Sequence, residues 1–214
     1  DRSRGLGDVY KRQLREVIQK GEDFLNIRFK ESFTSEAIKA SSGNVYIVQE
    51  TCHRACNESG IHKTVVGERR LVGDGLNARS LVAEIIQEQS GRYNAFITNY
   101  ASGFQETALA MHKWLLYPIL TSSIEELSKG LTYRSIRSKI TSGHPQGKNL
   151  NPGNITQALK AVSSLQLSKS IQPIILDYDE SNLTLHIVDK GFLIWLSMQD
   201  RNELLSTVGL PEMT

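Results

Sequence analysis

The order of secondary-structure signals in residues 107–189 is the feature that most constrains the fold. Apolar residues recur at helical spacing in "ETALAMHKWLLYPILTSS", "TYRSIRSKITSG" and "NPGNITQALKAVSSLQLSK", which predicts three helices. Two short apolar runs, "IQPIILDYD" and "LTLHIVD", follow with "ESN" between them, a pattern typical of a β-hairpin. Helix, helix, helix and hairpin is the order of a winged helix, and we expect that fold here.

Individual residues mark where these helices begin and end. Pro118 is expected to kink or end the first helix, and a short helical turn, "SIEELSKG", follows it. Thr132 can cap the next helix and Gly143 can end it, while Pro152 and Asn154 signal the start of the third. The apolar face of the third helix is expected to consist of Ile155, Leu159, Val162 and Leu165.

The preceding part of the chain contains a series of shorter patterns. Residues 24–29 favour a short edge strand, Thr34 or Ser35 can cap a short helix, and Gly91 separates two further helices. Gly103 interrupts the pattern again, so we expect separate cores in residues 14–102 and 103–214. The predicted fold class is mainly α with a small β-hairpin. The apolar faces around Gly91 are Leu76, Leu81, Val82, Ile85 and Ile86 before it, and Tyr93, Phe96, Ile97 and Tyr100 after it.

Residues 1–13, "DRSRGLGDVYKRQ", have no apolar periodicity and do not begin with Met. They resemble a translated sequencing adapter at the end of a metagenomic reading frame, so we set them apart as a non-native scar. On this interpretation the chain is a fragment, the tail of a longer protein.

Both cysteines lie in "GNVYIVQETCHRAC". On a helix over residues 45–57, Cys52 and Cys56 fall on one apolar stripe and would point into a core, whereas His53 lies on another face. We therefore expect buried, reduced thiols without metal; a metal site and a reactive thiol are the alternatives. The other members of the stripe are Val45, Val48 and Ala55.

Charge is distributed unevenly although the net charge is only +2. No Asp or Glu occurs between Glu126 and Asp177. Within a winged helix, the third helix faces the major groove of duplex DNA, and basic residues nearby contact phosphates. A solvated basic face and a surface for another protein domain are the alternatives. The expected nucleic-acid-binding residues are Arg134, Arg137, Lys139, Lys148, Asn154, Gln157 and Lys160.

The stretch "GHPQGKN" resembles a nucleotide-binding Walker A loop only superficially. It has three residues between its glycines instead of four, and Asn149 stands where a Ser or Thr would hold Mg²⁺. We interpret His144 as a loop or packing residue, because no Cys or carboxylate lies near it in sequence. We expect no catalytic residues in the chain.

The series "GEDFLNIRF", "SSGNVYIVQETCHRAC", a basic helical segment and "PIILDYDESNLTLHIVDKGFLIWL" resembles the C-terminal portion of bacterial AAA+ or STAND-type P-loop ATPases. The resemblance implies a helical lid over residues 14–102 followed by the winged helix over residues 103–214. It also implies that the turn at Gly43 and Asn44 opens a lid helix near the nucleotide. Val45 departs from the proline that the family often has there.

On this resemblance, the missing N-terminal ATPase domain would supply ATP and Mg²⁺ binding, and this fragment would bind no cofactor itself. The chain would couple nucleotide state to duplex DNA, a protein partner or a second copy of itself. The alternative is a stand-alone winged-helix regulator whose helical half mediates dimerisation. The chain has only two cysteines, and none of its apolar runs approaches about 18 residues. We therefore expect a cytoplasmic protein without membrane contact.

Overall fold

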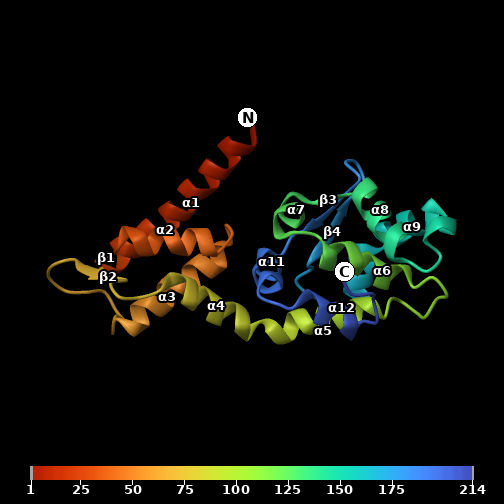
Figure 1. Cartoon of the computed structure of the whole chain (residues 1–214). Coiled ribbons are helices and arrows are strands. Elements are labelled where there is room, and N and C mark those ends of the chain that lie inside the picture. The colour runs from red at the N-terminus through yellow and green to blue at the C-terminus, as the bar shows by residue number, and fades with distance from the viewer. Residues whose placement is uncertain (1, 214) are drawn as a thin grey trace. The chain divides into compact units, whose positions relative to one another are not determined.

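The computed structural model describes residues 2–213, and it describes side chains for residues 9–147 and 149–213. The chain consists of two compact units that divide between Gln89 and Ser90. Both units are mainly helical with small sheets (Figure 1), so the predicted fold class is confirmed.

The first unit consists of packed helices and a pair of short parallel strands, of which β1 lies against α1. Strand β1 pairs with β2, with Ile27 opposite Arg70 and Phe29 opposite Val72. Helices α2 and α3 both pack against α4, and α1 packs against α2 and α3. The elements are α1 (Arg2–Leu25), β1 (Ile27–Phe29), α2 (Glu31–Ala40), α3 (Val45–Glu58), β2 (Arg70–Val72) and α4 (Ala78–Glu88).

Two expectations for the first unit need correction. Helix α2 begins at Glu31, before Thr34 and Ser35, and Thr34 is a buried residue inside it instead of its cap. In α3 the buried face includes Ile47 in place of Val45, which is exposed. The rest of the expected stripe holds, because Val48, Ala55 and Cys56 are buried and Cys52 packs against the same core.

Helix α1 includes residues 2–13 of the segment that we interpret as a scar. Residues 9–13 are all exposed, and Leu14 is the first buried side chain described in this helix. Ile18 is buried one turn later. The Tyr10 ring lies close to Gly43, so α1 makes contacts within the unit before Leu14, and the interpretation of residues 1–13 as a scar stays a prediction.

The second unit has the element order of a winged helix. Helix α6 packs against α8 and α9, and α10 packs against β4. The strand order is β3-β5-β4, with both pairings antiparallel, so β4 and β5 form the expected hairpin. The elements are α5 (Ser90–Ala101), α6 (Met111–Thr121), α7 (Ile124–Lys129), β3 (Leu131–Thr132), α8 (Tyr133–Gly143), η1 (Gly147–Asn149), α9 (Pro152–Lys160), α10 (Val162–Ser168), β4 (Leu176–Asp179), β5 (Thr184–Ile187), α11 (Lys190–Ser197) and α12 (Arg201–Thr207).

The boundary between the units lies before α5, and not at Gly103 where the sequence placed it. The reason is aromatic packing between segments far apart in the chain. The Tyr93 ring lies 5.5 Å from the rings of Phe192 and Trp195, and the Phe96 ring lies 5.3 Å from Phe192. Helix α5 thus belongs to the core of the second unit.

Most of the residues expected to begin or end helices in the second unit lie at or near helix ends. Thr132 caps α8 by accepting a hydrogen bond from the Ser135 amide. The third helix begins at Pro152, but Asn151 is its cap and Asn154 lies within it. Pro118 lies inside α6, which continues to Thr121. The predicted third helix is divided into α9 and α10, and its expected apolar face, Ile155, Leu159, Val162 and Leu165, is buried.

A buried glutamine joins α10 to the hairpin. Gln166 is fully buried; its Oε1 accepts hydrogen bonds from the amides of Ile175 (2.8 Å) and Leu176 (3.0 Å). Its Nε2 donates to the carbonyls of Leu176 (2.7 Å) and Val162 (3.1 Å). One side chain therefore satisfies several buried backbone groups at the start of β4.

Asp189 organises the start of α11. Its carboxylate accepts hydrogen bonds from the Gly191 amide (2.9 Å) and from Arg92 Nη1 (2.6 Å). The Tyr93 hydroxyl also contacts it at 3.3 Å, and Arg92 Nη2 donates to the Pro173 carbonyl. Burial, together with the Asp189 charge, raises the pKa of Tyr93. The carboxylate thereby joins α5 to α11.

Candidate nucleic-acid interface

Helix α8 presents two arginines to solvent. Arg134 and Arg137 are exposed and three residues apart, while Ile136 and Ile140 on the opposite face are buried. Both arginines line a shallow surface hollow of about 590 Å³. Neither forms an ion pair within the part of the chain whose side chains are described. Two guanidinium groups on one helix face are available to phosphate oxygens.

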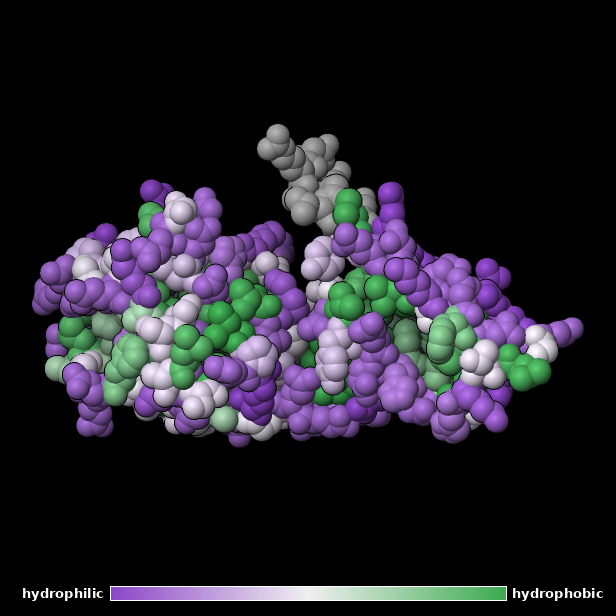
Figure 2. All heavy atoms as spheres, turned by 180° about the vertical axis from the view of Figure 1, so that it is seen from behind, coloured by the Kyte–Doolittle hydropathy of each residue, from purple (hydrophilic) through white to green (hydrophobic). Residues whose placement is uncertain are grey.

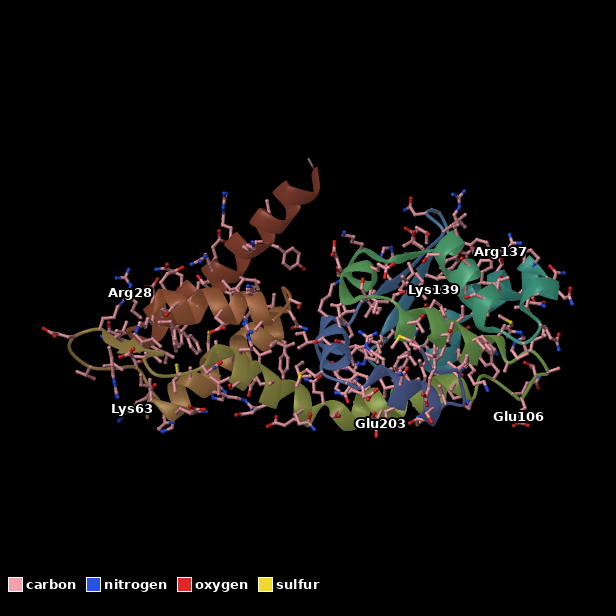
Figure 3. All side chains as sticks on the ribbon, in the orientation of Figure 1. Arg28, Lys63, Glu106, Arg137, Lys139 and Glu203 are labelled. Atoms are coloured by element: carbon pink, nitrogen blue, oxygen red, sulfur yellow. The ribbon has the colours of Figure 1, made fainter. Side chains whose placement is uncertain are left out.

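Lys139 does not share that face. Its side chain is half-buried, and its Nζ donates to the Thr121 carbonyl at the end of α6 (3.3 Å). Figure 3 labels it together with Arg137. Lys139 therefore stabilises a helix end with one of its three N–H donors, and its expected contact with phosphate stays a prediction.

Helix α9 carries the remaining expected residues with differing accessibility. Gln157 is exposed and Asn154 is half-buried. Lys160 is exposed, but its Nζ lies 2.7 Å from Glu180 Oε2 at the hairpin turn. The side chain of Lys148 lies outside the described residues. On α9, Gln157 is therefore an exposed polar side chain, whereas Lys160 is paired with Glu180.

The hairpin places acidic side chains close to the basic residues of the segment between Glu126 and Asp177. The absence of Asp and Glu from that segment of the sequence does not indicate this proximity. Besides Glu180, Asp177 accepts a hydrogen bond from Ser163 Oγ at 3.3 Å. Asp179 accepts bonds from the backbone amides of Ser181 and Asn182. All three carboxylates belong to "DYDE", which directly precedes the turn. These carboxylates oppose phosphate binding near the wing.

The expected lid turn has a local structural role. Gly43 has φ +83°, which glycine adopts without strain. Asn44 caps α3, because its Oδ1 accepts a hydrogen bond from the Ile47 amide (3.1 Å). Both residues are therefore explained by the start of α3, and their relation to a nucleotide stays a prediction.

The two cysteines are free thiols in different environments. Cys56 is buried as predicted, whereas Cys52 is half-buried on the wall of a hollow. Burial raises the pKa of both thiols, that of Cys52 to about 12. Among the residues whose placement is described, there is no group of three or more His, Cys, Asp or Glu side chains that could hold a metal ion.

The loop "GHPQGKN" is a structural connection. His144 is buried against the Trp114 ring at 4.7 Å, and its Nδ1 accepts a hydrogen bond from the Gln146 amide. A Cβ on Gly147 would overlap the Thr141 carbonyl oxygen, so a glycine is required for the close approach of the loop to α8. Packing therefore accounts for both the histidine and this glycine.

No protein-family model, curated protein or solved structure matches this chain. Over residues 2–213, none of the helices combines the length and the apolar character needed to cross a bilayer.

Proposed function

We propose that the chain is a regulatory module of a P-loop ATPase, and that its second unit binds duplex DNA with little sequence preference. The observation that carries the DNA-binding part of this proposal is the pair of exposed arginines on α8, without an ion pair among the described side chains, within a winged-helix element order. The ATPase part rests on the sequence resemblance. Arg134 and Arg137 would contact phosphates, while Gln157 and Asn154 on α9 are candidates for base contacts.

The acidic hairpin limits the strength of this interaction. Glu180 neutralises Lys160, so the main attraction would come from the arginine pair on α8. Such binding would be weak and strongly salt-dependent, since each phosphate contact releases a condensed counterion. In the whole protein the upstream ATPase domain would add its own contacts, and the first unit would carry the change in nucleotide state.

Replacing Arg134 and Arg137 together by Ala should weaken binding to a short fluorescein-labelled duplex. Fluorescence anisotropy over a range of salt concentrations gives the slope of log K against log salt. The double substitution should reduce the size of that slope by about 1.8, because each phosphate contact contributes about 0.9. The matched control is Arg28→Ala with Lys63→Ala, which removes the same charge from exposed positions of the first unit (Figure 3).

The control protein should keep the wild-type slope. If both double variants change the slope equally, the arginine pair on α8 has no special role and general charge accounts for binding. If the wild-type chain does not bind the duplex even at low salt, the DNA-binding proposal is wrong.

Replacing Glu180 by Gln should strengthen binding to the same duplex. The substitution releases Lys160 from its 2.7 Å ion pair, so one further cation becomes available and the slope should increase in size by about 0.9. Glu203→Gln on α12, where the glutamate is also exposed, makes the same charge change and serves as control. Equal effects of the two substitutions would show that Lys160 does not contact the duplex.

A further inference from the structure

A hollow between α1 and α3 in the first unit has the composition of a small-molecule site. Its volume is about 890 Å³. Its walls are largely apolar, and Phe24 at its edge is 77% exposed. In Figure 2 hydrophobic side chains show among hydrophilic ones on the surface. The apolar residues that line the hollow are Val17, Ile18, Phe24, Leu25, Phe29, Val48 and Ile61.

The thiols of Cys52 and Cys56 add to this apolar lining. Burial raises the pKa of Cys52 to about 12, so the thiol stays protonated and acts as a small hydrophobic group at neutral pH. This environment disfavours a thiolate nucleophile or metal ligand. The hollow is therefore suited to an apolar body that lies against the thiols.

The rim of the hollow is polar, and Lys20 places a positive charge there. The described lining residues include Lys20, His53 and His62 but no acidic residue. The histidines are joined through Asn57, whose side-chain amide lies 3.3 Å from a ring nitrogen of each. The Lys20 ammonium and the side-chain amide of Asn57 can donate hydrogen bonds to an anion, whereas each histidine already directs one ring nitrogen at Asn57.

Two glutamates near the hollow have partners within the unit. Glu22 accepts a hydrogen bond from the Phe29 amide at 2.7 Å. Glu50 pairs with Arg54 at 3.1 Å and lies 3.6 Å from His53 Nδ1. Neither glutamate lines the hollow, although the Glu22 charge acts on the Cys52 thiol. Among the lining residues, the positive charge available to a ligand is that of Lys20 at the rim.

The length of the hollow distinguishes between classes of occupant. Its lining on α3 extends from Val48 to Asn57, about 15 Å at about 1.5 Å per residue. A stable protein partner usually needs about 800 Å² of surface on each side, whereas hollows of this volume suit small molecules with apolar bodies. We propose that the α1–α3 hollow binds a medium-chain carboxylate, with its alkyl chain along the cysteines and its head group at the Lys20 rim.

The test is calorimetric titration of the full chain with dodecanoate below its micelle-forming concentration. We expect saturable binding at one site, and binding of dodecyltrimethylammonium weaker by about ten-fold or more because its head group is cationic. Changes in the backbone NMR spectrum should concentrate in α1 and α3. This site is separate from the DNA-binding proposal, since it lies wholly in the first unit.

Gly21 offers a way to fill the hollow without disturbing its walls. It lies on the lining, and a Cβ there would meet no atom within 4 Å. Gly21→Leu should weaken dodecanoate binding by about ten-fold or more, because the new side chain occupies the space of the alkyl chain. Lys20→Gln should weaken it several-fold by removing the cation at the rim.

Gly91→Leu is the matched control, because Gly91 is also an exposed helical glycine whose Cβ would meet no atom within 4 Å. It should leave dodecanoate binding unchanged. Absence of saturable binding, or equal binding by wild type and Gly21→Leu, would overturn the proposed site. Equal affinity for the cationic amphiphile would overturn the assignment of a carboxylate ligand.

Discussion

Replacing Gln166 by Met should destabilise the second unit by about 4 kcal/mol, since each buried polar group left without a partner costs about 1–3 kcal/mol. The amides of Ile175 and Leu176 and the carbonyl of Leu176 all lose a partner in this variant. Methionine is similar in length, so the main change is the loss of hydrogen bonds and not of volume.

Urea unfolding followed by tryptophan fluorescence measures this effect in the second unit. The chain has two tryptophans, and both Trp114 and Trp195 belong to that unit. Gln199→Met is the control, because the Gln199 side chain makes a single described hydrogen bond, to the Trp195 carbonyl at 3.2 Å. A loss of stability no larger than that of the control would contradict the role assigned to Gln166.

Replacing Asp189 by Ala should lower the free energy of unfolding of the second unit by about 3–4 kcal/mol. The substitution removes the cap of α11 and leaves the Arg92 guanidinium without its carboxylate. The Arg92 side chain is 29% exposed and that of Asp189 is 13% exposed, so solvent screens this pair only in part.

Asp200→Ala separates the two contributions. Asp200 caps α12 through the amides of Asn202 and Glu203, and it is exposed. Its replacement should cost about 1 kcal/mol, the usual value for a cap. If both aspartate variants lose the same stability in urea, the Arg92 pair contributes nothing measurable beyond the cap.

Much of the second unit could be predicted because its signals are local. Thr132 stands directly before the helix that it caps, and the burial of Ile155 and Leu159 follows from helical spacing. The hairpin was recognisable for the same reason, since two apolar runs flank a short polar turn.

Some errors are local, such as the cap assigned to Thr34, but the larger ones concern contacts between residues far apart in sequence. Strand β2 is a three-residue segment with exposed Arg70 and Leu71, and its partner is the remote β1. The boundary at Gly103 was wrong because Tyr93 packs against Phe192, which no local pattern could indicate. The same limit applies to the candidate interface, where Lys160 meets Glu180 only after the hairpin folds back.

The parallel pairing of β1 with β2 has a consequence for how the first unit forms. Helices α2 and α3 lie between the two strands in the sequence. Ile27 can therefore pair with Arg70 only after the intervening chain has been made and has turned back. Closing such a loop carries an entropic cost before its contacts contribute, and non-local pairings of this kind slow folding. During synthesis, the helices of this unit should therefore assemble first, and its small sheet should close last, after Val72 has left the ribosome.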